Sequence, residues 1–254
     1  MNELRPLREK RQESELFVDE AYKVLYEDDW MMVVDKPAPL PVHSVGRFRE
    51  RNLLSLLKKD GAGEGCAIVN RLDSETSGIV VVSKHSEAAG QLGSQFENRT
   101  VEKEYQGIMI GNLPVSAGLI STPLGYEEEN SIRRRKPDRF GETAETSFQV
   151  LEQKPGFSRL RILPKTGRMH QIRAHFAFIG HPLVGDKIYI DPKIFETYVE
   201  EGWQDSMRET VLLPRLALHA IWLKLKHPHY GDSLEFHSPL PSALENFWED
   251  LPRI

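Results

Sequence analysis

Hydrophobic and polar positions alternate along the chain in patterns that predict both strands and helices. Residues 157–163 and 216–226 alternate as strands do, and the unbroken apolar run at 79–82 indicates a buried strand at 79–83. Apolar residues at helical spacing predict helices at about 86–98 and 167–179. Because strands and helices intermix without strict βαβ alternation, we expect an α+β fold with a mixed, largely antiparallel sheet.

The same patterns place the remaining elements and the domain boundaries. Further strands are expected at 24–26, 30–34, 101–111 and 144–151, a short helix at 53–57, and a last helix at the capping-box signature Ser242–Glu245. The proline-rich segment 36–41 and the charged segment 112–142 are expected to be loops. For a chain of 254 residues, we expect one domain over 21–254, preceded by a loosely packed tail at 1–20.

The distribution of charge indicates a polyanionic partner, although the net charge is −5. Residues 153–185 contain six Lys and Arg but no Asp or Glu, and 133–139 form a second basic cluster interrupted only by Asp138. One positive face on an acidic body is typical of nucleic-acid binding. The alternative for both segments is a solvated run of charge without a partner.

The cellular compartment is indicated by the cysteine content and the N-terminal sequence. Cys66 is the single cysteine, so an internal disulfide is impossible and a reducing compartment is favoured. The N-terminal residues are charged and lack the apolar stretch of a signal peptide, and no run approaches the length of a membrane span. We therefore expect a cytoplasmic protein without membrane contact.

The segment Asn70–Lys84 (NRLDSETSGIVVVSK) is the first candidate for chemistry. Asp73 precedes a Thr76-Ser77-Gly78 turn and the buried strand, with Arg71 beside it. A carboxylate on a loop that a core strand braces is how a reactive acid is usually presented. The alternative is that Asp73 only caps the turn.

Two further segments supply complementary groups. Tyr105 lies in the middle of the strand expected at 101–111, and Arg168, His170, Gln171 and Arg173 follow the helix start expected at Thr166 and Gly167. Guanidinium groups and free amides around one pocket suit a phosphate, a carboxylate or a base edge. An aspartate, a guanidinium that keeps it ionised and a phenol form a coherent set for attack at an anomeric carbon.

Two long motifs resemble those of the RluA family of pseudouridine synthases. NRLDSETSGIVVVSK is similar to the family signature HRLD-x-x-TSG, and LPKTGRMHQIRAHFAFIGHPLVGDKIY to TGR-x-HQ-[IL]-R followed by GHP-[IL]-x-GD-x-x-Y. The opening at 33–43 and Lys103-Glu104-Tyr105 also match in family order, so the resemblance covers about residues 24–225. One departure is Asn70, which stands where the family usually has His.

The resemblance implies a bifurcated sheet with a central cleft flanked by helices, and isomerisation of RNA uridines to pseudouridine without cofactor or metal. It implies that Asp73 is the catalytic aspartate, that Arg173 pairs with it, and that Tyr105 packs on the uracil and handles the C5 proton. Arg71 matches an arginine associated with displacing the target base. Further substrate contacts are expected from the conserved-motif positions Thr76, Arg168, His170 and Gln171. The expected partner is ribosomal or transfer RNA, bound by a monomer without an obligate protein partner.

Two other functions are alternatives. A non-catalytic RNA-binding relative would keep the basic face but would not need a buried carboxylate. A nucleoside glycosidase would usually need a second carboxylate, and the acids near Asp73 are limited to Glu75. A metal site is not expected, because His170, His175 and His181 have neither a suitable spacing nor a nearby thiol or carboxylate before Asp186.

Overall fold

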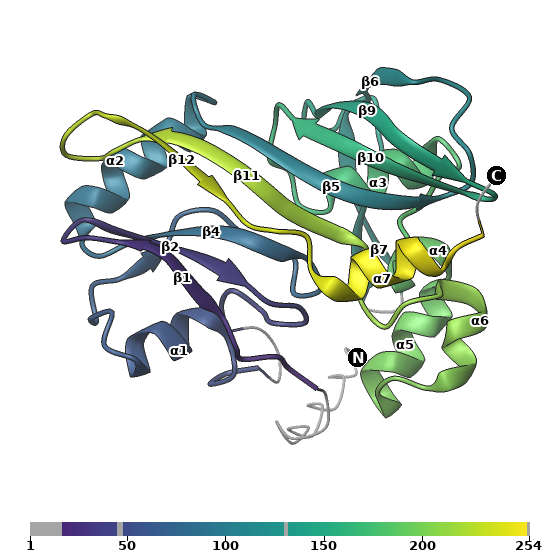
Figure 1. The fold of residues 1–254 in the computed structure, drawn as a ribbon, viewed down its shortest axis with the longest axis horizontal. Coiled ribbons are helices and arrows are strands. Elements are labelled where there is room, and N and C mark those ends of the chain that lie inside the picture. The colour runs from purple at the N-terminus through teal and green to yellow at the C-terminus, as the bar shows by residue number, and fades with distance from the viewer. Residues whose placement is uncertain (1–16, 45–47, 130–131, 253–254) are drawn as a thin grey trace, which may run out of the picture.

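One large sheet forms the centre of the computed structural model, which describes residues 17–44, 48–129 and 132–252 (Figure 1). Its strands follow the order β1 (Lys23–Glu27), β2 (Met31–Lys36), β4 (Ser77–Ser83), β11 (Leu218–Lys226), β5 (Glu102–Ile110), β10 (Phe157–Pro164), β9 (Glu145–Lys154) and β6 (Ala117–Ser121). Two short strands add to this path: β3 (Ala67–Ile68) on β4 and β12 (Ser233–His237) on β11. A separate pair consists of β7 (Leu124–Glu129) and β8 (Ile132–Pro137).

The sheet divides at β11. One edge of β11 pairs with β5, and the other pairs with β4 at His219–Ala220 and then with β12 from Trp222 onward. Only the β4–β11 pairing is parallel among the pairings of the described strands. The predicted α+β fold with a mixed, largely antiparallel and bifurcated sheet is therefore confirmed. The central cleft stays a prediction.

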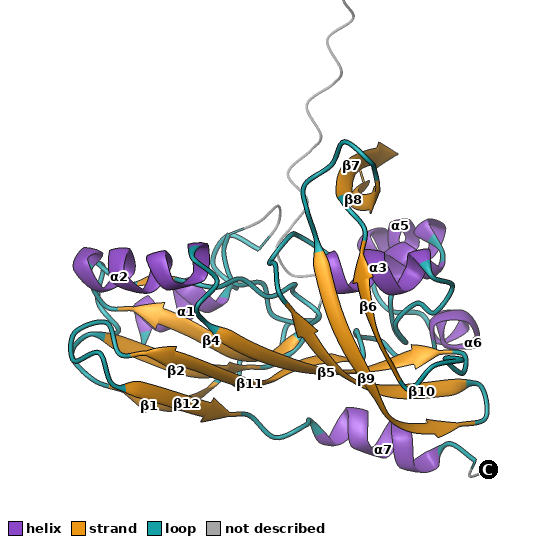
Figure 2. Cartoon of the chain, turned by 90° about the horizontal axis from the view of Figure 1, so that it is seen from above, coloured by secondary structure: helices purple, strands orange, loops and turns teal. Residues whose placement is uncertain are grey.

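Helices cover both faces of this sheet. They are α1 (Leu53–Lys59), α2 (Ser86–Glu97), α3 (Gln171–Phe178), α4 (Lys187–Ile190), α5 (Pro192–Glu201), α6 (Arg208–Val211) and α7 (Ser242–Asp250). Figure 2 shows α3 and the β7–β8 pair on one face and α7 on the opposite face. The core follows this arrangement, because Phe176 of α3 packs with Leu160 and Ile162 of β10, whereas Trp248 of α7 packs with Ile108 of β5. No helix of the described residues is long and apolar enough to cross a membrane.

The apolar run in β4 is buried on both faces, which explains why it does not alternate with polar residues. Val80 packs with Leu53 of α1 in one cluster, and Val81 on the other face packs with Leu92 of α2. Gly78 is the second residue of this strand and has a φ of 109°, and a Cβ there would lie 2.3 Å from the carbonyl oxygen of Ala220. Only glycine therefore allows β4 to approach β11 and fixes the position of the Asp73 turn.

Several sequence predictions are wrong in detail. Segment 112–142 contains β6, β7 and β8 instead of a continuous loop, and the helix expected from 167 begins only at Gln171. Ser242 is the first helical residue and not the cap, because the amide of Leu244 donates to the carbonyl of Pro241. Of the tail predicted at 1–20, residues 1–16 lie outside the described residues, and 17–20 have neither helix nor strand.

Candidate active site

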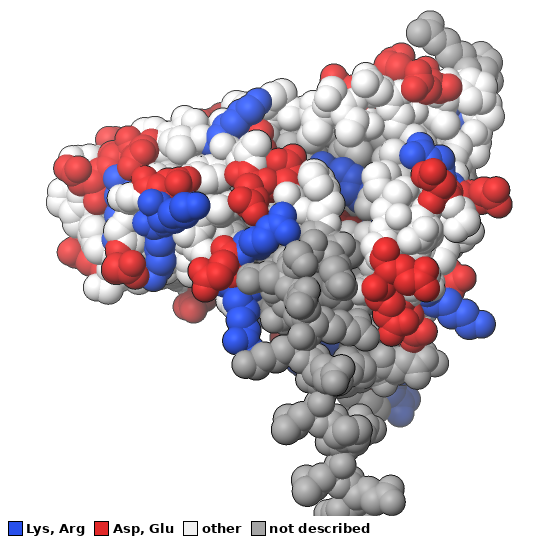
Figure 3. Space-filling model, turned by 90° about the horizontal axis from the view of Figure 1, so that it is seen from below, with Lys and Arg blue, Asp and Glu red and all other residues white. Residues whose placement is uncertain are grey.

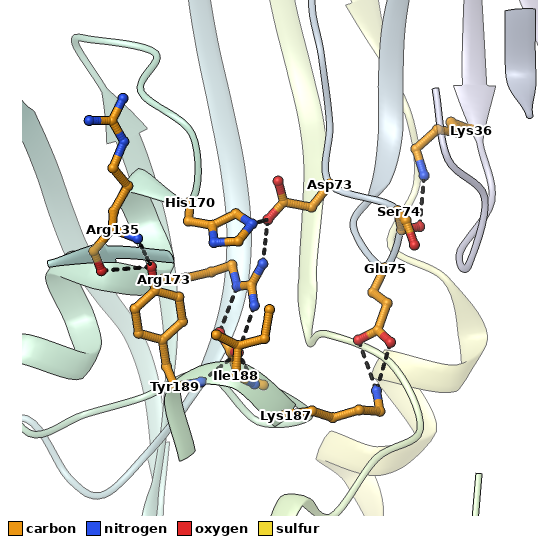
Figure 4. A network of polar contacts seen from close by, with 11 residues as sticks. Lys36, Asp73, Ser74, Glu75, Arg135, His170, Arg173, Lys187, Ile188 and Tyr189 are labelled. Atoms are coloured by element: carbon orange, nitrogen blue, oxygen red, sulfur yellow. Dashed lines mark hydrogen bonds and ion pairs between the residues drawn. The ribbon is translucent and has the colours of Figure 1, made fainter. Parts of the chain in front are cut away.

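Asp73 lies in the turn between β3 and β4 (Figure 4). The amide of Thr76 donates to the carbonyl oxygen of Asp73 at 3.0 Å and closes this turn. The Asp73 side chain is 27% exposed, so most of its carboxylate is desolvated while a substrate can still reach it. Thr76 is 3% exposed, which places its side chain in the base of the turn.

Arg173 joins two carboxylates across the site. Its Nη1 donates to Oδ2 of Asp73, and its Nε and Nη2 donate to the two carboxylate oxygens of Asp186, each at 2.8 Å. Asp186 is 0% exposed, and its Oδ1 also accepts from the amides of Ile188 and Tyr189 at the start of α4. The bidentate pair fixes the plane of the guanidinium, which leaves one edge for Asp73.

This arrangement keeps Asp73 ionised. Burial alone would raise the pKa of Asp73, but the positive charges of His170 and Arg173 lower it below its ordinary value. Burial and the neighbouring Arg173 also lower the pKa of His170 to about 4, so this imidazole is neutral near pH 7. Arg173 is therefore the cation that opposes protonation of Asp73 at neutral pH.

Tyr105 stands between the two halves of the core. On β5 its backbone lies between Ala220 of β11 and Ile162 of β10, and its ring packs against the hydrophobic clusters on both sides. Burial, and secondarily the negative charge of Asp73, raise the pKa of the Tyr105 phenol. The phenol therefore remains protonated at neutral pH and lies within electrostatic reach of Asp73.

His170 reaches Asp73 from the start of α3. Its backbone is left-handed, with φ of 54° and ψ of 17°, a conformation that costs a non-glycine residue about 1–3 kcal/mol. Its Nε2 lies 3.9 Å from Oδ2 of Asp73, and its ring meets that of Tyr189 edge-on at 6.0 Å. Its Nδ1 is buried without a hydrogen-bond partner in the part of the chain that the structure describes. The strained backbone thus holds the imidazole against the carboxylate.

Gln171 and Thr166 form hydrogen bonds within the protein. The Thr166 hydroxyl donates to Oε1 of Gln171 at 2.6 Å, and Nε2 of Gln171 donates to the carbonyl of Glu145 and the hydroxyl of Thr146. Gln171 is 4% exposed. These bonds fasten the start of α3 to β9, which leaves the Gln171 amide no free group for the substrate contact expected from the sequence.

Arg168 and Arg71 lie nearer to solvent. The Arg168 guanidinium contacts the carboxylate of Glu142 at 3.0 Å and the carbonyl of Thr143 at 3.3 Å, with a third of its side chain exposed. Arg71, two residues before Asp73, is exposed, and its charge lies close enough to His43 to contribute to lowering the pKa of that imidazole, after burial. Both cations lie in loop segments, and Arg71 is open to solvent while Arg168 is paired with Glu142.

Asn70 has a structural function in this chain. Its Oδ1 accepts from the amide of Val81 at 2.7 Å, and its Nδ2 donates to the carbonyl of Ile79 at 3.3 Å. The side chain thereby imitates a neighbouring strand along β4. The departure from the family's His leaves the Asp73 turn braced.

The basic run at 153–185 does not form one positive face. Lys154 is buried, and its amine donates to carbonyls at the end of α7, including that of Leu251 at 3.2 Å. Arg161 pairs with Glu104 at 2.6 Å, and Arg173 is the buried group described above. Figure 3 shows Lys and Arg interspersed with Asp and Glu on the face seen there. The sequence alone could not show which of these cations bind groups within the protein.

The histidines considered for a metal are dispersed. His175 contacts Thr146 and the carbonyl of Thr122, whereas His181 contacts the carbonyl of Ile110. Among the described residues there is no group of three or more His, Cys, Asp or Glu that could hold a metal ion.

Comparisons with known proteins identify the family. The family model for RNA pseudouridylate synthase matches residues 30–178. Ribosomal large subunit pseudouridine synthase D of Pseudomonas aeruginosa is 38% identical over 86% of this chain and 68% of that protein. Its counterpart in Nitrosomonas europaea is 37% identical over 87% of this chain and 63% of that protein.

The fold gives the same answer. The solved structure of Human RNA Pseudouridylate Synthase Domain Containing 4 superposes with a TM-score of 0.69 at 25% identity, covering 89% of this chain and 91% of that one. The corresponding human Domain Containing 1 protein also has a TM-score of 0.69 at 25% identity, over 90% of this chain and 88% of that one. The chain therefore belongs to the RNA pseudouridylate synthase family and is an RNA pseudouridine synthase, an isomerase.

Proposed function

We propose that this synthase acts on uridines of ribosomal RNA and that Asp73 is its reacting carboxylate. The observation that supports this most strongly is the ion pair of buried Arg173 with the partly exposed Asp73, at 2.8 Å, with the Tyr105 phenol within electrostatic reach. The choice of ribosomal over transfer RNA is supported by the relatives named ribosomal large subunit pseudouridine synthase C and D. An RNA-binding protein without catalysis would have no use for a carboxylate held ionised against burial.

The reaction rearranges a single nucleotide. The N1–C1′ bond breaks and its electrons pass to N1 of uracil, the base turns, C5 bonds to C1′, and the C5 proton leaves while N1 gains one. Asp73 either attacks C1′, in which case its bond to C1′ breaks as C5 attaches there, or takes a proton from C2′ and returns it after C5 has attached. Both routes need the ionised carboxylate that Arg173 maintains. The uridine must first leave its stack, which costs a few kcal/mol and least in loops.

The other site residues have distinct proposed functions. Tyr105 packs against the uracil ring. Because its phenol is protonated, it can accept the C5 proton only if it gives up its own hydroxyl proton at the same time. Neutral His170 contacts the base beside Asp73, while Arg71 and Arg168 contact the RNA backbone. Thr76 and Gln171, being buried, act by holding the turn and the start of α3.

One copy of the chain supplies all of these groups, so we propose a monomer that acts without a protein partner. Its proposed location is the cytoplasm, consistent with the single buried cysteine. The proposal requires no cofactor or metal, because the carboxylate, the guanidinium and the phenol suffice for the steps described.

Replacing Asp73 tests the proposal. D73N should abolish release of tritium from C5-tritiated ribosomal RNA, because an amide can neither attack C1′ nor take a proton. RNA affinity should stay within about a few-fold, since phosphate contacts dominate binding. Transfer RNA and free uridine are tested separately as alternative substrates. Normal turnover by D73N, or release of free uracil from uridine, would contradict the proposal.

A further inference from the structure

The turn that presents Asp73 is held at three successive residues by buried basic side chains from three different elements (Figure 4). The contacts are Arg173 of α3 on the Asp73 carboxylate, Lys36 of β2 on the Ser74 carbonyl at 3.1 Å, and Lys187 of α4 on the Glu75 carboxylate. The first two act directly on Asp73 or on the backbone beside it. The third pair, Glu75 with Lys187, is not used by the mechanism above.

Lys187 is fully occupied by this contact. Its side chain is 1% exposed, and its amine donates to both carboxylate oxygens of Glu75 and to the carbonyl of Pro214, each at 2.8 Å. The amine also lies 4.5 Å from the centre of the Tyr198 ring. An ammonium has three donors, so this geometry satisfies all of them and leaves Lys187 one position.

The pair is continuous with the catalytic charges. Lys187 directly follows Asp186, so two consecutive residues at the start of α4 hold the turn: Asp186 through Arg173, and Lys187 through Glu75. Burial raises the pKa of Glu75 above its ordinary value, although the charges of Lys187 and Arg173 act to lower it. Glu75 therefore lies within electrostatic reach of the guanidinium that Asp73 needs.

We propose that Glu75 and Lys187 are a positioning pair for the isomerisation, in which Lys187 neutralises Glu75 so that Arg173 stays on Asp73. The inference rests on the proposed role of Asp73. Without Lys187, the ionised form of Glu75 is a second negative charge two residues from Asp73 and competes for Arg173. The turn also loses its attachment to α4. Without both charges, the competition disappears and only the attachment to α4 is lost.

The test compares K187M, E75Q and the double variant K187M/E75Q on a ribosomal RNA transcript. K187M should lower kcat about tenfold or more, as small displacements of reacting groups do, while KM changes within about twofold. As the pH falls, its rate should also drop at a higher pH than that of the wild type, because an ionised Glu75 without Lys187 favours the protonated form of Asp73. E75Q should lower kcat less and show no such displacement. The double variant should recover kcat relative to K187M, since no buried carboxylate is left unpaired.

Controls separate this inference from the proposed function. K58M removes the exposed pair of Lys58 with Glu64 at 3.0 Å and should leave kcat and the pH profile unchanged. D73N reports on the proposed function, because an active D73N overturns that proposal whatever Lys187 does. With D73N inactive, equal losses in K187M and K187M/E75Q, or an unshifted pH profile in K187M, overturn the positioning pair.

Folding is checked by thermal unfolding of each variant. If K187M does not fold, the double variant decides: a folded protein with at least about a tenth of wild-type kcat supports the pair, and a folded inactive one overturns it. If neither folds, E75Q decides, because a lower kcat at unchanged KM supports the pair and wild-type kcat overturns it.

Discussion

The residues of the site show how a buried acid is kept reactive. Asp186 takes two donors of the Arg173 guanidinium, so a single nitrogen remains for Asp73 and its direction is fixed. A lysine at this position could not make the bidentate contact, so the position of its charge relative to Asp73 would not be fixed. Tyr105 is fixed in a similar way, because its ring packs against the core on both sides while its phenol lies within electrostatic reach of Asp73.

Removal of the Tyr105 hydroxyl separates packing from proton transfer. Y105F should retain RNA affinity, because the ring remains, but should slow product formation about 100-fold, the usual scale of acid–base assistance. RNA deuterated at C5 of uridine should then show a primary isotope effect that the wild type lacks. Y230F, whose tyrosine is 68% exposed, is the matched control and should behave as wild type. An unchanged rate in Y105F would remove Tyr105 from proton transfer.

At the level of elements, the contact between β4 and β11 determines where the Asp73 turn can lie. The two strands meet at Gly78 and Ala220, and the pairing is the parallel one in the sheet. Because a Cβ at Gly78 would overlap the Ala220 backbone, β4 cannot accept any other residue there without moving. Such a movement would reach Asp73, five residues earlier in the same segment.

Substitution of Gly78 measures this dependence. G78A should lower the free energy of unfolding by about 2–5 kcal/mol, from backbone strain and overlap, and lower kcat in the fraction that folds. The matched control is G90A inside α2, where a Cβ meets nothing within 4 Å. G90A should raise stability by about 0.5–1 kcal/mol, since alanine favours a helix over glycine. Chemical denaturation of both variants is the measurement, and equal stability of G78A and wild type would contradict the close approach.

Sequence patterns predicted the strands and helices best where packing follows the local pattern. The alternation in β10 and the apolar run of β4 both appear as expected, since each strand's burial matches its pattern. The β7–β8 pair was missed because Glu127 there binds both Arg134 and Lys136, so charged side chains replace the apolar alternation. The pairing of β7 with β8 depends on ion pairs, which the pattern of hydrophobic and polar residues does not predict.

The residues of the candidate site could be predicted where a recognisable sequence motif assigns them a role. Asp73 and Arg173 could be named because each lies in a long motif, and the structure brings their side chains together from 100 positions apart. Asp186 and Lys187 were not recognised as partners of that site. Both lie in the second motif, but the motif does not say what they contact, and only the fold reveals that they turn inward to meet Arg173 and Glu75.

Across the whole molecule, buried histidines link stability to pH. His219 is 0% exposed, and its Nε2–H donates to the carbonyl of Ser238 while its Nδ1 faces the Ser77 hydroxyl at 2.7 Å. Burial, despite the Ser238 carbonyl, lowers the pKa of His219 to about 4, and the cation of Arg215 acts in the same direction. His170 at the active site also has a pKa of about 4.

These values set the direction of the pH dependence. Between about pH 6.5 and pH 4 the unfolded chain binds protons at these histidines and the folded chain does not, so the free energy of unfolding falls as the pH falls. Each histidine should contribute about 1–3 kcal/mol to this loss, and neither contributes to a pH dependence above about pH 7.5. Denaturant titrations at a series of pH values should show H219Q with a shallower loss than wild type. H229Q, which alters an exposed ring, should keep the full loss. Parallel plots of unfolding free energy against pH for H219Q and wild type would contradict this prediction. They would mean that His219 binds a proton as readily in the folded protein as in the unfolded chain, so that the polar contacts joining β4 to β11 do not depend on a neutral imidazole.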